Sequence, residues 1–205
     1  MDKKKLFSLL SLMGLLFLIY GGIKISQQMA TNDEIIQQAV EIPDDFKRQF
    51  SRTKTHRRFE ELKYATFLSP EGNRQNWKIL GNEYKLVNFW ATWCAPCVLE
   101  LPSLQKLAKR YEGQGLKVVP ISFDTRYDHD QIKRFLKNRG ISDFAAYFDD
   151  NSEVQGSVRI AGIPTSYLLD PQGRVTHIFE GDANWVSPSA IAFFDAVLQK
   201  DSIEN

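Results

Sequence analysis

The chain is poor in residues that bind metals. Its 205 residues include two cysteines and three histidines, and the histidines stand far apart at His56, His129 and His177. A structural zinc site needs four ligands, and a cysteine pair without a closely spaced histidine pair supplies two of them. A c-type haem site needs a histidine directly after its second cysteine, where this chain has Val98. These absences disfavour a zinc site and exclude covalent haem attachment.

The chain also lacks an excess of charge of either sign. Its 26 basic and 25 acidic residues leave a formal net charge of +1, so no nucleic-acid partner is expected. A hydrophobic content of 43% suits a packed core. The length fits one domain with additional segments, or two small domains.

One long apolar run is free of charge. Three lysines precede LFSLLSLMGLLFLIYGGI, which extends from Leu6 to Ile23. As a helix it would span about 27 Å, close to the hydrocarbon thickness of a bilayer. A cleaved signal peptide is the alternative, but its apolar core is usually shorter, and no clear cleavage site follows Gly22. We therefore expect a transmembrane anchor over residues 6–23 and a cytoplasmic tail over residues 1–5.

The lysines also predict the orientation of the anchor. Basic residues are enriched on the cytoplasmic side of membrane spans. We expect a single-pass protein with the lipid bilayer as one partner and the residues after the anchor outside the cytoplasm, where disulfides persist.

Residues 24–61 are interpreted as a spacer. A short helix that Pro43 ends is expected in the first half. The second half is basic, with a sparse apolar stripe at Phe46, Phe50 and Phe59. Its basic residues are either solvated near the membrane or in contact with anionic lipid or an acidic partner. The folded domain is expected over residues 62–205.

From Leu62 onward the chain alternates between strand and helix patterns. Two hairpins are predicted, around the turns SPEGN and Asp170–Gly173. Further strands are predicted over residues 85–91, 116–123 and 144–148, and helices over residues 95–111, 130–138, 152–158 and from Ser187 onward, with Asn151 capping the third. This order predicts an α/β domain whose central sheet has helices on both faces.

The two cysteines stand in the run KLVNFWATWCAPC, which ends at Cys97. An apolar strand leads through a short turn into a helix that begins around Cys94-Ala95-Pro96-Cys97. The positive end of the helix dipole favours a thiolate at the first cysteine, and the second lies within reach for a disulfide. The pair therefore predicts disulfide exchange with other proteins. A purely structural disulfide is the alternative, but so small a ring gains little from loop entropy.

Two motifs in fixed order carry a family resemblance. The first is NFWATWCAPC with Glu100 and Pro102 after it, and the second is GIPTSYLLDPQGRV from Gly162. With them, the chain resembles the membrane-anchored TlpA/ResA/CcmG group of thioredoxin-fold proteins over about residues 62–200. The tail GDANWVSPSAIAFF is most similar to the TlpA branch. The resemblance implies a thioredoxin-like fold, in which helices flank a central mixed sheet, behind an N-terminal transmembrane helix.

The resemblance also implies roles for the cysteines and their neighbours. Cys94 is expected to be exposed and to attack the client, and Cys97 to be more buried and to resolve the mixed disulfide. Pro96 fits the first helical turn because that position needs no N–H. Trp93 is expected to shield the sulfur and to offer clients an apolar face, with simple packing as the alternative.

Pro164 matches the cis-proline that lies opposite the active site in this group. With a cis Ile163–Pro164 bond, the adjacent backbone can pair with an extended client segment. Ile163 and Pro164 are therefore expected to bind substrate. An ordinary trans turn is the alternative.

Asn88 and Glu100 depart from ordinary thioredoxin. Asn88 stands where thioredoxin has a buried aspartate beneath the resolving cysteine, and an amide cannot take that thiol's proton. Glu100 follows Cys97 by three residues, so it lies on the same side of the helix. We expect it to tune the thiol pKa and to shuttle the proton. A solvated surface glutamate is the alternative, and Pro102 is expected to kink the helix.

With these features, the resemblance implies a thiol–disulfide oxidoreductase of the inner (cytoplasmic) membrane that reduces client-protein disulfides in the periplasm. A membrane thiol donor would re-reduce it, and no cofactor is needed beyond the redox-active Cys94–Cys97 pair. Relatives act on copper-site cysteines or on apocytochrome c, so a role in respiratory cytochrome assembly is implied. The alternatives are a disulfide-donating oxidase and a Sco-type copper chaperone, for which His177 is the only candidate distal ligand. A peroxidase of the peroxiredoxin type is disfavoured, because it would need a threonine three residues before its cysteine, where this chain has Ala91.

Overall fold

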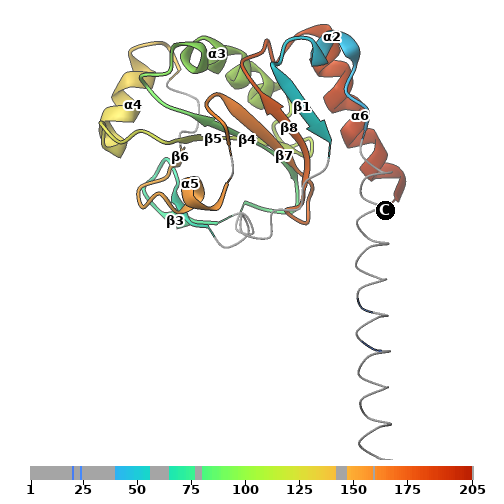
Figure 1. The fold of residues 1–205 in the computed structure, drawn as a ribbon, viewed down its shortest axis with the longest axis horizontal. Coiled ribbons are helices and arrows are strands. Elements are labelled where there is room, and N and C mark those ends of the chain that lie inside the picture. Colours follow the sequence, from blue (N-terminus) through green and yellow to red (C-terminus); the bar gives the residue numbers. More distant parts are fainter. Residues whose placement is uncertain are drawn as a thin grey trace, which may run out of the picture. The chain divides into compact units, whose positions relative to one another are not determined.

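A computed structural model describes residues 20, 24, 40–55, 65–76, 80–141, 147–158 and 160–204 (Figure 1). Residues 39–205 form one compact unit. The predicted tail over residues 1–5 and, apart from Tyr20, the predicted anchor over residues 6–23 lie outside the described residues. Among those that are described, no helix combines the length and the apolar character needed to cross a membrane.

The described part of the domain is built on one mixed β-sheet, as the sequence predicts. Eight strands lie in the order β1-β8-β7-β4-β5-β6-β2-β3. The strands are β1 (Arg52–Thr55), β2 (Phe67–Leu68), β3 (Arg74–Gln75), β4 (Tyr84–Trp90), β5 (Leu116–Ser122), β6 (Tyr147–Phe148), β7 (Thr165–Leu169) and β8 (Val175–Glu180). Strand β4 lies at the centre, where it pairs in parallel with β5 and antiparallel with β7.

The alternation of side chains along β4 divides the core in two. Leu86 and Trp90 pack on one face, in a cluster with residues of α3, α4 and α6. Val87 and Phe89 pack on the other, in a cluster with Val154 of α5. Successive residues of a strand point to opposite faces, so a strand buried on both is mostly apolar. Lys85 and Asn88 are the buried polar residues of β4. The helices are α2 (Asp44–Lys47), α3 (Ala95–Arg110), α4 (His129–Lys137), α5 (Glu153–Ser157) and α6 (Pro188–Glu204).

The pairing of β4 with β7 brings two distant motifs together. These strands run antiparallel, with Phe89 opposite Thr165, so the end of β4 lies beside the start of β7. The turn that leads into α3 therefore meets the loop that ends at Pro164. Both predicted hairpins are confirmed, β2 with β3 and β7 with β8.

The spacer predicted over residues 24–61 is wrong in its second half, because residues 40–55 belong to the domain. Strand β1 pairs with β8 and extends the sheet. Phe46 is fully buried and Phe50 is 8% exposed. The basic residues of this strand include Lys54, whose Nζ lies 2.8 Å from a carboxylate oxygen of Glu180. The polar stretch Arg-Thr-Lys-Thr hides the strand from a search for hydrophobic periodicity.

Smaller expectations also change. Leu99, an apolar residue of the helix predicted over residues 95–111, is 78% exposed. Asn151 does not cap α5, which instead has Ser152 at its N-cap position, and the carboxylate of Asp149 accepts hydrogen bonds from two backbone N–H groups of the helix. The helix predicted ahead of Pro43 and part of the strand predicted over 144–148 lie outside the described residues.

Candidate active site

The cysteine pair lies where β4 ends and α3 begins. A disulfide joins Cys94 to Cys97, whose Cα atoms are 5.3 Å apart. Cys94 is the N-cap residue of α3, and its sulfur accepts a hydrogen bond of 3.3 Å from the backbone N–H of Cys97. Pro96 stands in the first turn, where its missing N–H leaves no bond unmade. The helix N-terminus and the adjacent N–H group both favour negative charge on the Cys94 sulfur.

Burial distinguishes the two sulfur-bearing residues. Cys94 is 6% exposed, whereas Cys97 is fully buried. Cys94 was expected to be exposed, but it is largely covered in the disulfide form. It is still the more exposed of the two cysteines, as expected, and so it is the one that a partner can reach.

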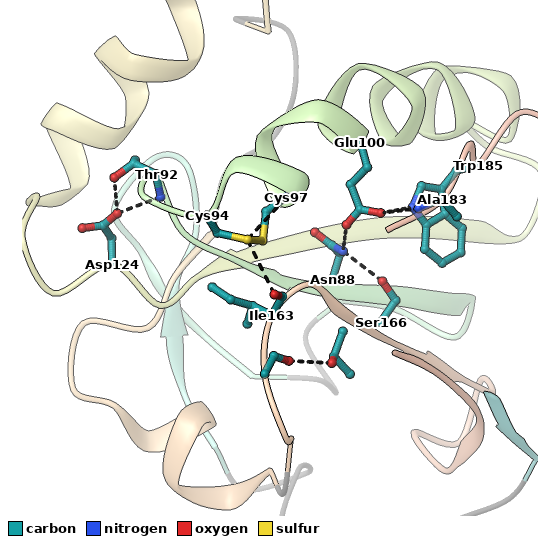
Figure 2. Close-up of a disulfide and its surroundings, with 12 residues drawn as sticks. Asn88, Thr92, Cys94, Cys97, Glu100, Asp124, Ile163, Ser166, Ala183 and Trp185 are labelled. Atoms are coloured by element: carbon teal, nitrogen blue, oxygen red, sulfur yellow. Dashed lines mark hydrogen bonds between the residues drawn. A yellow bond between two sulfur atoms is a disulfide. The ribbon is translucent and has the colours of Figure 1, made fainter. Parts of the chain in front are cut away.

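The loop before β7 lies against the disulfide. The Ile163–Pro164 peptide bond is cis, as predicted. The Cys94 Sγ atom lies 3.6 Å from the carbonyl oxygen of Ile163 (Figure 2). Strand β7 begins only at Thr165, so the Ile163 peptide lies outside the sheet ladder. Backbone groups beside the reactive sulfur are thus placed where an extended chain could pair with them.

Exposed apolar side chains occur on α3, on the turn before it and in the loop ahead of α4. Trp93, next to Cys94, is 55% exposed, and Leu99, in the first turns of α3, is 78% exposed. Tyr127, in the loop ahead of α4, is 42% exposed. Simple packing therefore does not account for Trp93. Its predicted role in client binding stays a prediction.

Glu100 is a buried carboxylate, so the alternative of a solvated surface residue is wrong. The residue is 3% exposed. Its Oε2 atom accepts hydrogen bonds from the indole N–H of Trp185 at 2.7 Å and from the backbone N–H of Ala183 at 3.1 Å. Its Oε1 atom accepts a bond of 2.9 Å from the amide nitrogen of Asn88. Figure 2 shows these three donors around the carboxylate.

Burial raises the pKa of Glu100 from an ordinary 4.5 to about 7. The three hydrogen bonds stabilise the carboxylate and oppose this rise, whereas the nearby charge of Asp182 adds to it. Desolvation is the larger effect, since a charge loses more on leaving water than these donors restore. A carboxyl group with a pKa near 7 can both accept and donate a proton at neutral pH.

Asn88 connects the carboxylate to the sheet. It lies on β4 opposite Ser166 of β7 and is fully buried. Its Nδ2 group donates both to Glu100 and, at 2.9 Å, to the hydroxyl oxygen of Ser166. Its Oδ1 atom has no hydrogen-bond partner among the described residues. In Figure 2 this oxygen lies on the side of the amide that faces the disulfide.

Three contributors to the site were missed from the sequence. Asp124 fixes the active-site turn, because its carboxylate accepts hydrogen bonds from the N–H and the hydroxyl of Thr92. A signal for Asp124 existed, since it follows β5, and neighbouring parallel strands end at the same edge of the sheet. Ser166 is polar within a buried run, which was also a visible signal. Trp185 gave none, because its contact with Glu100 depends on tertiary packing.

The fold and this site define a thioredoxin-like protein with a Cys-x-x-Cys disulfide at the start of a helix. Thiol–disulfide exchange proceeds by attack of a thiolate on a disulfide, and a cysteine pair at the start of a helix favours that thiolate. The chain belongs to the AhpC/TSA family, which residues 61–178 match.

Curated relatives of this chain carry the name thiol-disulfide oxidoreductase ResA. The protein from Oceanobacillus iheyensis is 36% identical over 97 residues, which cover 47% of this chain and 48% of that protein. The protein from Bacillus cereus is 29% identical over 112 residues, which cover 55% of this chain and 63% of that protein. The chain thus spans between about half and just under two thirds of the length of these relatives.

Solved structures share the fold at low sequence identity. A secreted thiol-disulfide isomerase from Corynebacterium glutamicum has a TM-score of 0.58 at 22% identity, covering 80% of this chain and 97% of that one. StoA from Bacillus subtilis has a TM-score of 0.51 at 23% identity, covering 67% and 96%. These likenesses show the fold.

Proposed function

We propose that this chain is a membrane-anchored reductase of protein disulfides that works in the periplasm. The observation that supports this best is the place of the Cys94 sulfur. It caps α3 and lies 3.6 Å from the Ile163 carbonyl oxygen, beside the cis-proline. The helix N-terminus favours the attacking thiolate, and the Ile163 peptide offers backbone groups to an extended client chain.

The proposed cycle starts from the dithiol form. The Cys94 thiolate attacks one sulfur of a client disulfide, and the other client sulfur leaves as a thiolate. Cys97 then loses its proton and attacks Cys94. This second attack breaks the mixed disulfide, releases the reduced client and forms the Cys94–Cys97 disulfide. A membrane thiol donor returns the pair to the dithiol form.

Glu100 is proposed to handle the proton of Cys97. The two residues are three apart on α3, and both are buried. Water has little access to a buried thiol, so an internal base speeds its deprotonation. A pKa near 7 suits that task, because the group then accepts and returns the proton at the same pH.

Two features of the sequence support the proposed site of action. The uncharged run from Leu6 to Ile23, behind three lysines, supports an anchor in the inner membrane. The tail from Gly181 to Phe194 resembles the TlpA branch, whose members act on copper-site cysteines. We therefore propose that the client is a protein with copper-site cysteines in cytochrome assembly, rather than apocytochrome c.

A trapping experiment tests the proposal. In the Cys97→Ser variant, Cys94 can attack but nothing resolves the product, so mixed disulfides with clients accumulate. They should be seen as adducts that a reductant dissolves, and mass spectrometry would identify the partner. The Cys94→Ser variant is the matched control, because it keeps one buried thiol and should trap little. Equal trapping by both variants, or none by either, would remove Cys94 from its proposed role.

The direction of exchange separates the two redox alternatives. Equilibration with glutathione gives the potential of the Cys94–Cys97 pair. The reduction potential of a reductase such as thioredoxin is about −270 mV, and that of a strong oxidant is about −120 mV. The Ala-Pro pair between the cysteines lacks the histidine of strong oxidants, so we expect a value near the reducing end. A value near the oxidising end would favour the oxidase.

The copper-chaperone alternative loses its candidate ligand. His177 is 1% exposed on β8, and one ring nitrogen lies 2.7 Å from the carbonyl oxygen of Val40 and the other 2.9 Å from the Thr176 hydroxyl. Burial lowers its pKa to about 4, so it is neutral and fully engaged in the fold at neutral pH. No observation favours this second function.

A further inference from the structure

The side-chain amide of Asn88 is hydrogen-bonded through its nitrogen but not through its oxygen. Its nitrogen donates to Glu100 and to Ser166, whereas its oxygen, fully buried, has no hydrogen-bond partner among the described residues. An amide oxygen can accept two hydrogen bonds, and leaving it without one in the interior costs free energy. A buried polar atom without a partner on the disulfide side of the site calls for a physical explanation.

The surroundings of Glu100 explain which oxygen can carry a proton. Oε2 already faces two donors that cannot reverse, the indole N–H of Trp185 and the backbone N–H of Ala183. A proton on Oε2 would be directed at other protons. The acidic proton must therefore reside on Oε1, whose partner among the described residues is the NH2 group of Asn88. That group is also a donor, so the arrangement seen here fits the carboxylate and conflicts with the acid.

A half-turn of the amide removes the conflict. The two ends of an asparagine side chain have nearly the same shape, so exchanging them needs no extra volume. After the exchange, Asn88 Oδ1 accepts from the protonated Oε1 of Glu100. The Ser166 hydroxyl, which now accepts from Nδ2, can rotate and donate to the same oxygen. Nδ2 then occupies the disulfide side of the amide.

We propose that Asn88 is a positioning residue that turns its amide with the protonation state of Glu100, and so presents Cys97 with an acceptor or a donor. With Glu100 ionised, the oxygen faces the cysteine and favours the thiol, whose S–H can donate to it. With Glu100 protonated, the nitrogen faces the cysteine and favours the thiolate. This inference rests on the proposed function and adds a residue to its mechanism.

The proton balance of the resolving step follows. A thiol with a carboxylate becomes a thiolate with a carboxylic acid, so one proton passes from Cys97 to Glu100. The amide turns but neither gains nor loses a proton. The turned amide stabilises the thiolate at the moment when it must attack. The charge of Asp182 also acts on Glu100, and it favours the protonated state and hence the turned amide.

Nuclear magnetic resonance of the full-length chain tests this directly. In a Cys94→Ser variant, Cys97 is the only thiol, and the Asn88 side-chain NH2 resonances are assigned by their loss in Asn88→Leu. If that variant fails to fold, the shift caused by Ser166→Ala supplies the assignment. Above the Glu100 pKa of about 7, the NH2 protons should show contacts to Ser166. Below it, these contacts should weaken and contacts to the Cys97 β protons should appear.

Glu100→Gln, made in the same variant, is the matched control. Trp185 and Ala183 both donate, so they should hold the Gln oxygen and direct its NH2 group at Asn88. The amide should then stay turned at every pH, and the ultraviolet absorbance of the Cys97 thiolate should show a lowered pKa. Contacts that follow pH in the parent and not in Glu100→Gln support the proposal. A single set of contacts at every pH in the parent overturns it.

The same measurements separate this inference from the proposed function. None of them needs a client or an electron donor. A chain that traps no client but turns the amide would refute the reductase and keep the coupling. A chain that traps clients with a fixed amide would do the reverse.

Discussion

Replacing Glu100 by glutamine should change how stability depends on pH. The pKa of Glu100 is raised from 4.5 to about 7 in the folded chain. Below pH 4.5 the group is protonated whether the chain is folded or not, so the raised pKa costs nothing. Between these pH values the unfolded chain releases a proton that the folded chain retains. Stability therefore falls as pH rises through this window, and the loss is complete above about pH 7.

The size of the effect follows from the shift. A difference of about 2.5 pKa units corresponds to about 3 kcal/mol of lost stability once Glu100 is ionised. Glutamine is neutral at every pH and fits the same donors if Asn88 turns its amide. The difference in unfolding free energy between Glu100→Gln and the parent should therefore grow by about 3 kcal/mol from pH 4.5 to above pH 7.

Urea unfolding of the oxidised, full-length chain at a series of pH values measures this difference. The parent curve alone is insufficient, because His177 acts in an overlapping window with the opposite sign. Its contribution cancels when the variant is compared with the parent. Glu112→Gln, at an exposed position just after α3, gives the baseline for an amide in place of a carboxylate. A difference that stays constant with pH would show that Glu100 is not desolvated, and the reasoning would fail.

Two further variants test the same electrostatics. Trp185→Phe keeps an aromatic ring but removes the indole N–H, which donates to Glu100 over 2.7 Å. The carboxylate then loses about 1.5–3 kcal/mol of hydrogen-bond stabilisation, so the pKa of Glu100 should rise further above 7. Carbon-detected titration of the Glu100 carboxyl group checks this, and an unchanged or lower pKa would contradict it. His177 has its pKa lowered from 6.5 to about 4, so the parent loses about 3 kcal/mol as pH falls through that window, because only the unfolded chain takes up the proton. His177→Gln should unfold in urea without that dependence, and an equal slope in both chains would refute the assignment.

The centre of the fold was predictable because local and tertiary signals agree there. The run before Cys94 is mostly apolar on both faces, as suits a central strand, and Asn88 is a buried polar residue within it. The cysteine pair fixes the start of α3, and Pro164 fixes the loop opposite. The spacing of Glu100 from Cys97 also placed the carboxylate on the correct side of the helix. What spacing could not give is its burial, which depends on Trp185, far away in the sequence.

Leu99 shows that apolar character alone does not mark a core position of this helix. Helical spacing places it on the face opposite Cys97 and Leu101, because it stands two residues from each of them. Leu101 and Leu104, further along, are fully buried. Sequence alone shows that Leu99 is apolar, but not that a partner rather than the domain would cover it.

The misassigned spacer has the largest consequence for the site. Phe46 and Phe50 pack against Trp185, with ring centroids 5.7 Å and 5.5 Å away. Trp185 in turn donates to Glu100. A domain cut at residue 62 would lose both phenylalanines, and the indole that holds the carboxylate would lose much of its packing. The segment that follows the predicted anchor therefore supports the proton-handling group, and its two phenylalanines matter more to the site than its many basic residues.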